Sequence, residues 1–163
     1  MKALVVFDSF FGNTEQIARA IGTALADDYE VGLVRVGEFK PEQLSGVQLL
    51  IVGSPTRGFR PTPAINAFIS GIPAGGLKGV EVAAFDTRIT AQDVNNIVYT
   101  PMVKIFGYAA KPIADKLARK GSHVIVLPEG FHVEGEKGPL KEGELERAAA
   151  WAKQNLASQR MVA

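Results

Sequence analysis

Residue types that can bind an anion gather in the stretch SFFGNT, Ser9 to Thr14, which follows the apolar run ALVVF and precedes a helical pattern. The stretch is therefore predicted to be the turn between a buried strand and a helix that starts near Asn13. Unpaired backbone N–H groups at such a helix start and the hydroxyls of Ser9 and Thr14 would converge on one point. The helix dipole favours an anion there, so the turn predicts a phosphate site.

The composition of this turn limits the kind of phosphate it would hold. The turn contains no Lys or Arg, so neutral donors would bind the group, which suits a monoester better than a nucleotide triphosphate. The nucleotide-binding patterns GxxxxGK[ST] and GxGxxG do not follow the first apolar run. One alternative stays open at this point, namely that Ser9, Asn13 and Thr14 only cap the helix.

Five short apolar runs, closed by Gly, Pro, Ser or Asp, indicate strands buried on both faces. They cover residues 3–7, 31–36, 49–52, 80–85 and 124–127. Helical spacing is found at residues 17–25, 65–69, 113–119 and 145–156, while EFKPEQLSG holds at best a short helix. The alternation predicts an α/β fold, a doubly wound five-stranded parallel sheet with helices on both faces. We expect residues 1–163 to form a single domain, with ligands at the carboxyl ends of the strands.

SFFGNT resembles the phosphate loop of the flavodoxin family, roughly [ST]-x-[TFY]-G-N-[ST] after the first strand. The match includes Ser9, Gly12, Asn13 and Thr14, and Phe11, after Phe10, takes the aromatic form found in the flavodoxin-like modules of flavodiiron proteins. GSPT after the third run is a second feature of the family. The resemblance covers nearly the whole chain. It implies the short-chain flavodoxin-like fold, strand order 2-1-3-4-5, and FMN as the cofactor, with its 5′-phosphate in the first loop.

The loop GSPTRGFRPTP after the third run is similar to the loop that flanks the flavin in this family. The resemblance implies that Ser54, Pro55 and Thr56 lie along the ribityl chain and the pyrimidine edge. It also implies that Gly58 offers a backbone carbonyl to the flavin N5 proton, in a peptide flip that requires tolerance of positive φ. Phe59 is predicted to cover the ring, and the alternative is a surface aromatic in a Pro-braced loop.

The third loop, FDTRITAQDVNN, departs from the family pattern of a stacking Tyr or Trp with Gly and acidic residues. It offers Asp86, Thr87 and Arg88 instead. Two interpretations remain open. Either the second face of the flavin is covered by Arg88, by Tyr99 or by a partner protein, or Arg88 pairs with Asp86 or Asp93 in a solvated loop.

Three arginines, Arg57, Arg60 and Arg88, belong to the two loops that would frame the flavin. Flavodoxins usually surround the flavin with acidic residues, which lower its potential. A cation within about 6 Å at an effective dielectric constant near 20 would favour the reduced anion by roughly 3 kcal/mol, on the order of 100 mV. The hypothesis is a less strongly reducing carrier than the family norm, or one that holds the reduced flavin for two-electron exchange.

The composition excludes several classes of partner. The net charge is +1 with scattered basic residues, so neither nucleic acid nor a membrane surface is an expected partner. The chain has no cysteine for disulfides or thiolate metal sites, and its apolar runs are far shorter than the roughly 20 residues that span a bilayer. With no basic and apolar leader after Met1, we expect a cytoplasmic protein.

Other chemistry finds little support in the residues. His123 and His132 are not at metal-ligand spacing, so no metal site is predicted. A response regulator shares this sheet but requires Asp at the end of the third strand, where Ser54 stands. Asp8 and Asp86 both end strands, but a two-carboxylate magnesium site formed by them would lack that phosphoacceptor. The G-x-S-x-G pattern of serine hydrolases is absent.

Three hypotheses follow. The first is an FMN-binding electron-transfer protein, a monomer or weak dimer, that works with a redox partner protein whose donor and acceptor sides are not identified. The second is a small FMN-dependent NAD(P)H:quinone-type oxidoreductase, because SPTRGF is loosely similar to the PTRFG-type loop of those enzymes and residues 90–108 offer extra length. The third is a flavin-free module that kept the fold.

Overall fold

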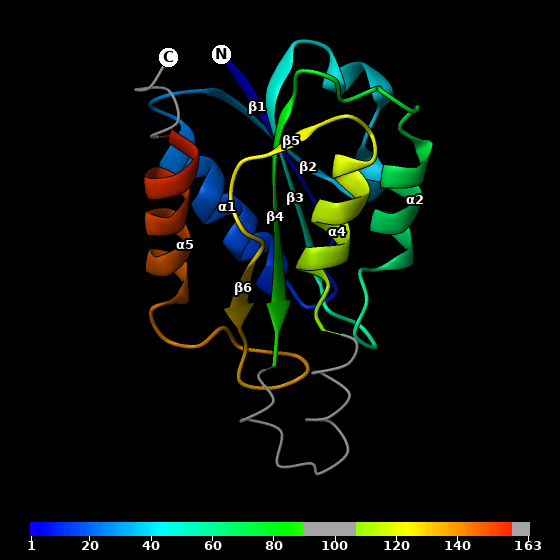
Figure 1. Ribbon diagram of the computed structural model, residues 1–163. Helices are drawn as coiled ribbons and strands as arrows, with labels where there is room; N and C mark the ends of the chain where they lie inside the picture. The colour runs from blue at the N-terminus through cyan, green and yellow to red at the C-terminus, as the bar shows by residue number, and fades with distance from the viewer. Residues whose placement is uncertain (90–106, 158–163) are drawn as a thin grey trace.

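The computed structural model describes residues 1–89 and 107–157, built around a parallel sheet (Figure 1). The strands are β1 (Lys2–Phe7), β2 (Glu30–Arg35), β3 (Val47–Pro55), β4 (Glu81–Arg88), β5 (His123–Val124) and β6 (Glu129–His132). They are ordered β2-β1-β3-β4-β5, and β6 also pairs with β4. Both the parallel sheet and the predicted strand order are confirmed.

Two apolar cores, one on each face of the sheet, explain why the strand sequences are continuously apolar. In β1, Val5 and Phe7 face one core while Leu4 and Val6 face the other. The same alternation continues in β3 and β4. Successive side chains of a strand point to opposite faces, so a strand covered on both sides favours apolar residues at successive positions.

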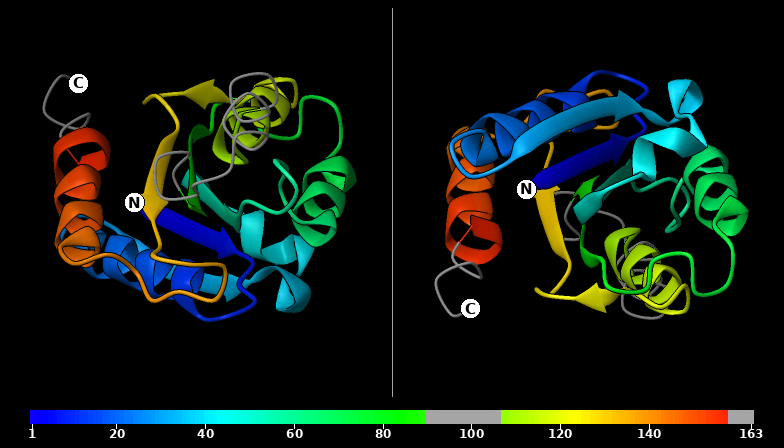
Figure 2. Two further views of the ribbon diagram at one scale, coloured as in Figure 1. Left: turned by 90° about the horizontal axis from the view of Figure 1, so that it is seen from below. Right: turned by 90° about the horizontal axis from the view of Figure 1, so that it is seen from above.

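The helices cover the two faces in pairs (Figure 2). The helices α1 (Asn13–Leu25) and α5 (Glu144–Ala152) pack on one face, and α2 (Pro63–Gly71) and α4 (Ala110–Ala118) pack on the other. All four predicted helices are present, and a π-helical turn, Lys153–Ala157, continues the last one. Two short 3₁₀ turns, Val36–Glu38 and Pro41–Leu44, form the connection where at best a short helix was predicted.

The predicted fifth strand is the one element that needs correction. Residues 124–127 were expected to form it, but β5 ends at Val124 and the sheet resumes with β6, which gives six strands instead of five. The residues between them leave the sheet, and the Leu127 side chain is 85% exposed. Pro128 has no N–H to donate to a strand partner, which disfavours continued pairing at this edge.

Strand β6 is held in place by a charged cluster with α5. The Arg147 guanidinium donates to the Gly130 carbonyl over 2.5 Å and to the Glu144 carboxylate over 2.7 Å, and the His132 N–H donates to the same carboxylate. Desolvation raises the pKa of Glu144, but the hydrogen bonds from Arg147 and His132 outweigh it and lower the pKa overall. The cluster fixes the segment that leaves β6 toward the carboxyl ends of β3 and β4.

Candidate functional site

The turn between β1 and α1 is held by the side chain of Ser9. Its Oγ accepts hydrogen bonds from the N–H of Gly12 (3.1 Å) and the N–H of Glu15 (3.4 Å). The Ser9 N–H donates to the Asp8 carboxylate over 2.9 Å. Gly12 has φ 89°, a left-handed conformation that glycine adopts without the steric cost of a side chain. Ser9 therefore organises the turn from within.

The end of the turn and the start of α1 offer backbone donors that no described residue bonds. Among the described residues, no acceptor bonds the N–H groups of Phe11, Asn13 and Thr14. The Thr14 hydroxyl lies 2.8 Å from the Thr87 hydroxyl at the end of β4. Free N–H groups and the positive end of the helix dipole coincide here, as an anion requires. The helix-cap interpretation accounts for the hydrogen bonds that Ser9 accepts, and the remaining donors are open to water or to a ligand.

A cavity opens beside this turn at the carboxyl ends of β3 and β4. Most of the residues predicted from the sequence line it, and three others, Ile89, Val133 and Glu136, join them. The predicted residues on the cavity wall are Ser9, Phe10, Phe11, Asn13, Thr14, Pro55, Thr56, Arg57, Thr87 and Arg88. The predicted residues away from the wall are Gly12, Ser54, Gly58, Phe59 and Asp86.

Ser54 and Thr56 serve the loop after β3 in different ways. The buried Ser54 hydroxyl donates to the Pro55 carbonyl (2.8 Å) and accepts from the Thr62 N–H (3.0 Å), so it braces the loop. Thr56 lies on the cavity wall, and its Oγ1 accepts from the Ala109 N–H over 3.1 Å. The two residues were predicted to face the flavin together, whereas here only Thr56 has access to the cavity.

The residues after Thr56 form a tight turn. Arg57 and Arg60 exchange two backbone hydrogen bonds, of 2.8 and 3.0 Å. Gly58 and Phe59 between them have φ 54° and 67°. Positive φ at Gly58 matches the conformational freedom predicted for it. Phe59, predicted to cover a ring, lies away from the cavity wall. The aromatic residues on that wall are Phe10 and Phe11.

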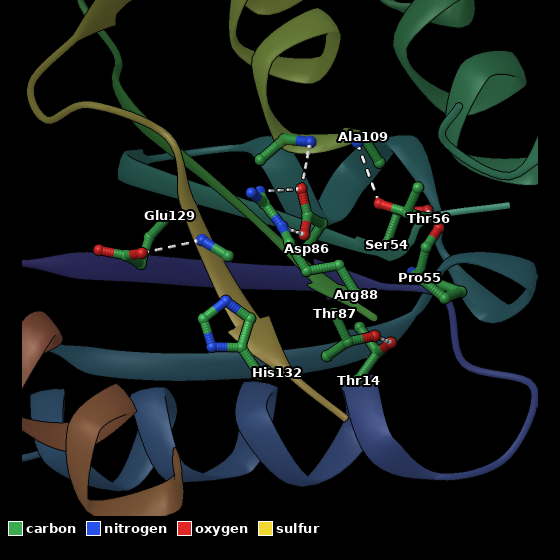
Figure 3. Close-up of polar contacts among 12 residues, drawn as sticks. Thr14, Ser54, Pro55, Thr56, Asp86, Thr87, Arg88, Ala109, Glu129 and His132 are labelled. Carbon is green, nitrogen blue, oxygen red and sulfur yellow. Dashed lines mark hydrogen bonds and ion pairs between the residues drawn. The ribbon is translucent and has the colours of Figure 1, made fainter. Parts of the chain in front are cut away.

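Asp86 and Arg88 form a closed ion pair at the end of β4. Two guanidinium nitrogens donate to the two carboxylate oxygens, each over 2.6 Å, and the Ala110 N–H at the start of α4 donates to the same carboxylate (Figure 3). Asp86 is fully buried, which raises its pKa, and the Arg88 cation opposes that rise. Of the two interpretations, the described structure contains the pairing with Asp86; Asp93 and Tyr99 lie outside the described residues.

Arg88 is also fixed from its two sides. Its guanidinium carbon lies 3.8 Å from the centre of the Tyr108 ring. On the β6 side, a Cβ added at Gly130 would overlap the guanidinium, so only glycine leaves room for it. The charge of Arg88 is therefore both paired and immobilised.

The segment after β6 joins the site, although the sequence interpretation treated it as a loop that closes into a solvated helix. The Asn13 side chain donates to the Lys137 carbonyl over 3.2 Å, and a Cβ at Gly138 would overlap the Asn13 amide. Val133 and Glu136 line the cavity. The only local signal is the pair of glycines near Pro139, which does not specify a partner 124 positions away.

Arg57 is the exposed cation of the cavity. Its guanidinium carbon lies 5.0 Å from the centre of the Phe10 ring and 6.0 Å from that of Phe11. Its ion pair with Glu136 is long, at 3.8 Å, and both side chains are well exposed, 44% and 73%. Such a pair contributes little energy, so Glu136 compensates the charge of Arg57 only weakly.

Comparisons with known proteins agree with this geometry. No protein-family model and no curated protein matches the sequence. An archaeal flavodoxin structure has a TM-score of 0.76 at 22% identity, over 98% of each chain. Flavodoxin 2 from Bacillus cereus has a TM-score of 0.69 at 26% identity, over 93% of this chain and 95% of its own. The chain has the flavodoxin fold.

The chain also matches part of a larger protein. Rubredoxin oxygen:oxidoreductase from Desulfovibrio gigas aligns with 99% of this chain but only 36% of its own, with a TM-score of 0.74 at 20% identity. Within residues 1–89 and 107–157, no cluster of three His, Cys, Asp or Glu side chains is placed to hold a metal ion. The same residues include no helix with the length and apolar character needed to span a membrane.

The Asp86–Arg88 pair generates a prediction on stability. Arg88→Gln leaves a buried carboxylate without its cation, so the free energy of unfolding should fall by about 3–5 kcal/mol at pH 7. The raised pKa of Asp86 means that the folded state takes up a proton more readily than the unfolded state. The loss should therefore shrink as the pH falls to about 4.5, measured by urea unfolding.

A double variant is the control for this experiment. Asp86→Asn combined with Arg88→Gln removes the titrating group, and its stability loss at pH 7 should be smaller than that of Arg88→Gln alone. An equal loss at both pH values in Arg88→Gln alone would show that Asp86 is not the group left uncompensated.

Proposed function

We propose that the protein binds FMN and carries electrons between redox partner proteins. The observation that carries the proposal is the set of N–H groups in the turn and at the start of α1 that no described residue bonds, next to a cavity at the carboxyl ends of the strands. Doubly wound sheets of this strand order bind their ligand at the switch point between β1 and β3, where this turn lies. The flavodoxin fold of the chain supports the same assignment.

The residues present fit the phosphate end of FMN. The free N–H groups of Phe11, Asn13 and Thr14 would donate to the phosphate oxygens. The Ser9 oxygen already accepts two hydrogen bonds, so its proton is available to a ligand. The open space around Gly12, where an added Cβ would meet no atom within 4 Å, leaves the backbone accessible. FMN, when bound, supplies the one- and two-electron chemistry, and the chain sets its affinity and potential.

A charge placed among these donors tests the cofactor assignment. Thr14→Asp puts a carboxylate beside the unbonded N–H groups, where it would repel the phosphate. The affinity for FMN should fall at least about 100-fold, read from the flavin absorbance that remains after loose flavin is removed. Ser9→Asp should behave in the same way.

The matched control is Thr23→Asp, which adds the same charge to an exposed position near the other end of α1. It should retain FMN within about twofold of the unmutated protein, because about two and a half turns of helix separate it from Thr14. Wild-type protein that retains no flavin would refute the proposal. Equal losses in Thr14→Asp and Thr23→Asp would refute the assignment of the phosphate to this turn.

Arg57 is the residue that we expect to raise the potential of the flavin. It lies on the cavity wall with only a weak partner, whereas Arg88 is compensated by Asp86 and Arg60 is absent from the wall. A guanidinium near the ring would stabilise the negative charge that reduction adds. Arg57→Gln should therefore lower the potential by about 30–100 mV, measured by potentiometric titration.

Arg60→Gln is the charge-matched control, and it should move the potential by less than half as much. An unchanged potential in Arg57→Gln would show that this cation does not tune the flavin. Steady oxidation of NADPH by the purified protein would favour the oxidoreductase hypothesis over the electron carrier.

A further inference from the structure

Arg35, the last residue of β2, connects that strand to both ends of the phosphate turn. One guanidinium nitrogen, Nη1, donates to the Ser9 carbonyl over 2.8 Å. The other, Nη2, donates to the Glu15 carboxylate in the first turn of α1 over 2.7 Å. The side chain passes over the ring of Phe7, whose centre lies 5.3 Å from the guanidinium carbon, and is 39% exposed.

We propose that Arg35 is a positioning residue for the phosphate site, because its guanidinium fork holds the entry of the turn and the start of α1 at a fixed separation. Arg35 lies outside the predicted site, and its hydrogen bonds in the described part of the chain go to Ser9 and Glu15 instead of the residues with unbonded N–H groups. It would therefore act through Ser9 and Glu15, and its effect would be specific to ligands that carry a phosphate. This inference rests on the proposed function.

The backbone of Ser9 shows why the entry of the turn needs such a clamp. Its N–H is bonded to Asp8, its side-chain oxygen accepts from Gly12 and Glu15, and its carbonyl is bonded to Arg35. The carbonyl belongs to the peptide unit that leads into the rest of the turn. If it were free to rotate, the unbonded donors that follow would lose their common orientation. A turn without its own cation depends on that orientation more than a turn with a lysine does.

The charge of Glu15 gives Arg35 a second effect. A carboxylate in the first turn of α1 would oppose the binding of a dianionic phosphate. A hydrogen bond from Arg19 and the charge of Arg35 hold the pKa of Glu15 below its ordinary value, although its partial desolvation acts against them. The carboxylate is thus ionised at neutral pH. Its hydrogen bond from Arg35 holds it toward β2, where its charge is paired.

Arg19 provides a control that the chain itself offers. It donates to the same carboxylate over 2.7 Å, but it is 63% exposed, and its hydrogen bonds within the described residues go to Glu15 alone. Arg19→Gln and Arg35→Gln each remove one positive charge from Glu15, and only Arg35→Gln releases the Ser9 carbonyl. A purely electrostatic effect would appear in both variants, whereas a positioning effect would appear in one.

The experiment compares FMN with riboflavin, which has the same ring and no phosphate. Arg35→Gln should weaken FMN binding about tenfold and riboflavin binding less than twofold, measured by quenching of flavin fluorescence. Arg19→Gln should change both affinities less than twofold. Arg35→Lys, which keeps the charge and loses the fork, should fall between the unmutated protein and Arg35→Gln for FMN alone.

Several outcomes would overturn the inference. Equal losses for FMN and riboflavin in Arg35→Gln would make Arg35 a structural link between β2 and α1. Equal losses of FMN in Arg19→Gln and Arg35→Gln would reduce the effect to charge. Thermal unfolding of each variant identifies a loss of affinity that comes from misfolding. If Arg35→Gln is misfolded, Arg35→Lys must still bind FMN more weakly than the unmutated protein and riboflavin equally well for the inference to stand.

A calorimetric titration with inorganic phosphate separates this inference from the proposed function. If the unmutated protein binds phosphate but neither flavin, the FMN proposal fails, and a weaker phosphate affinity in Arg35→Gln than in Arg19→Gln still supports the role of Arg35. If FMN binds the unmutated protein and Arg35→Gln equally well, only the inference about Arg35 fails. If phosphate and both flavins fail to bind, the two proposals fall together.

Discussion

The site depends on the backbone donors that a helix leaves without partners in its first turn. At the start of α1 the N–H groups of Phe11, Asn13 and Thr14 have no acceptor among the described residues, although Thr14 is almost completely buried. An N–H group on a residue as buried as Thr14 costs free energy unless a ligand or water satisfies it. The parallel sheet brings them to the carboxyl ends of its central strands, and the side chains around the turn serve to keep them there.

Charge around the site is arranged in pairs, and this changes the electrostatic picture expected from the sequence. Three arginines close to a bound flavin would raise its potential strongly. Arg88 is compensated by the buried Asp86 and held between Tyr108 and Gly130, so its cation stabilises the fold at the end of β4. That leaves Arg57 as the cation on the cavity wall with only a weak partner, and the expected effect on the potential is correspondingly smaller.

The strand, turn and helix order was predictable because each depends on local chemistry, as Gly12 in its left-handed conformation illustrates. Contacts between distant segments were not. The sequence leaves open whether Arg88 pairs or faces a ligand, because the answer depends on burial. The fifth strand was predicted too long because the residues before Pro128 are apolar enough to continue a strand. The bond from Asn13 to Lys137 joins segments with no shared pattern.

The most direct test of the account is a two-dimensional ¹H–¹⁵N spectrum recorded while FMN is added. Hydrogen bonds to a phosphate shift amide protons downfield, so the signals of Phe11, Asn13 and Thr14 should move strongly with FMN and only slightly with riboflavin. Their unbonded state in the described structure predicts that these three shift more than the amides further along α1. Binding of FMN without a shift at these amides would contradict the account, because the phosphate would then lie elsewhere.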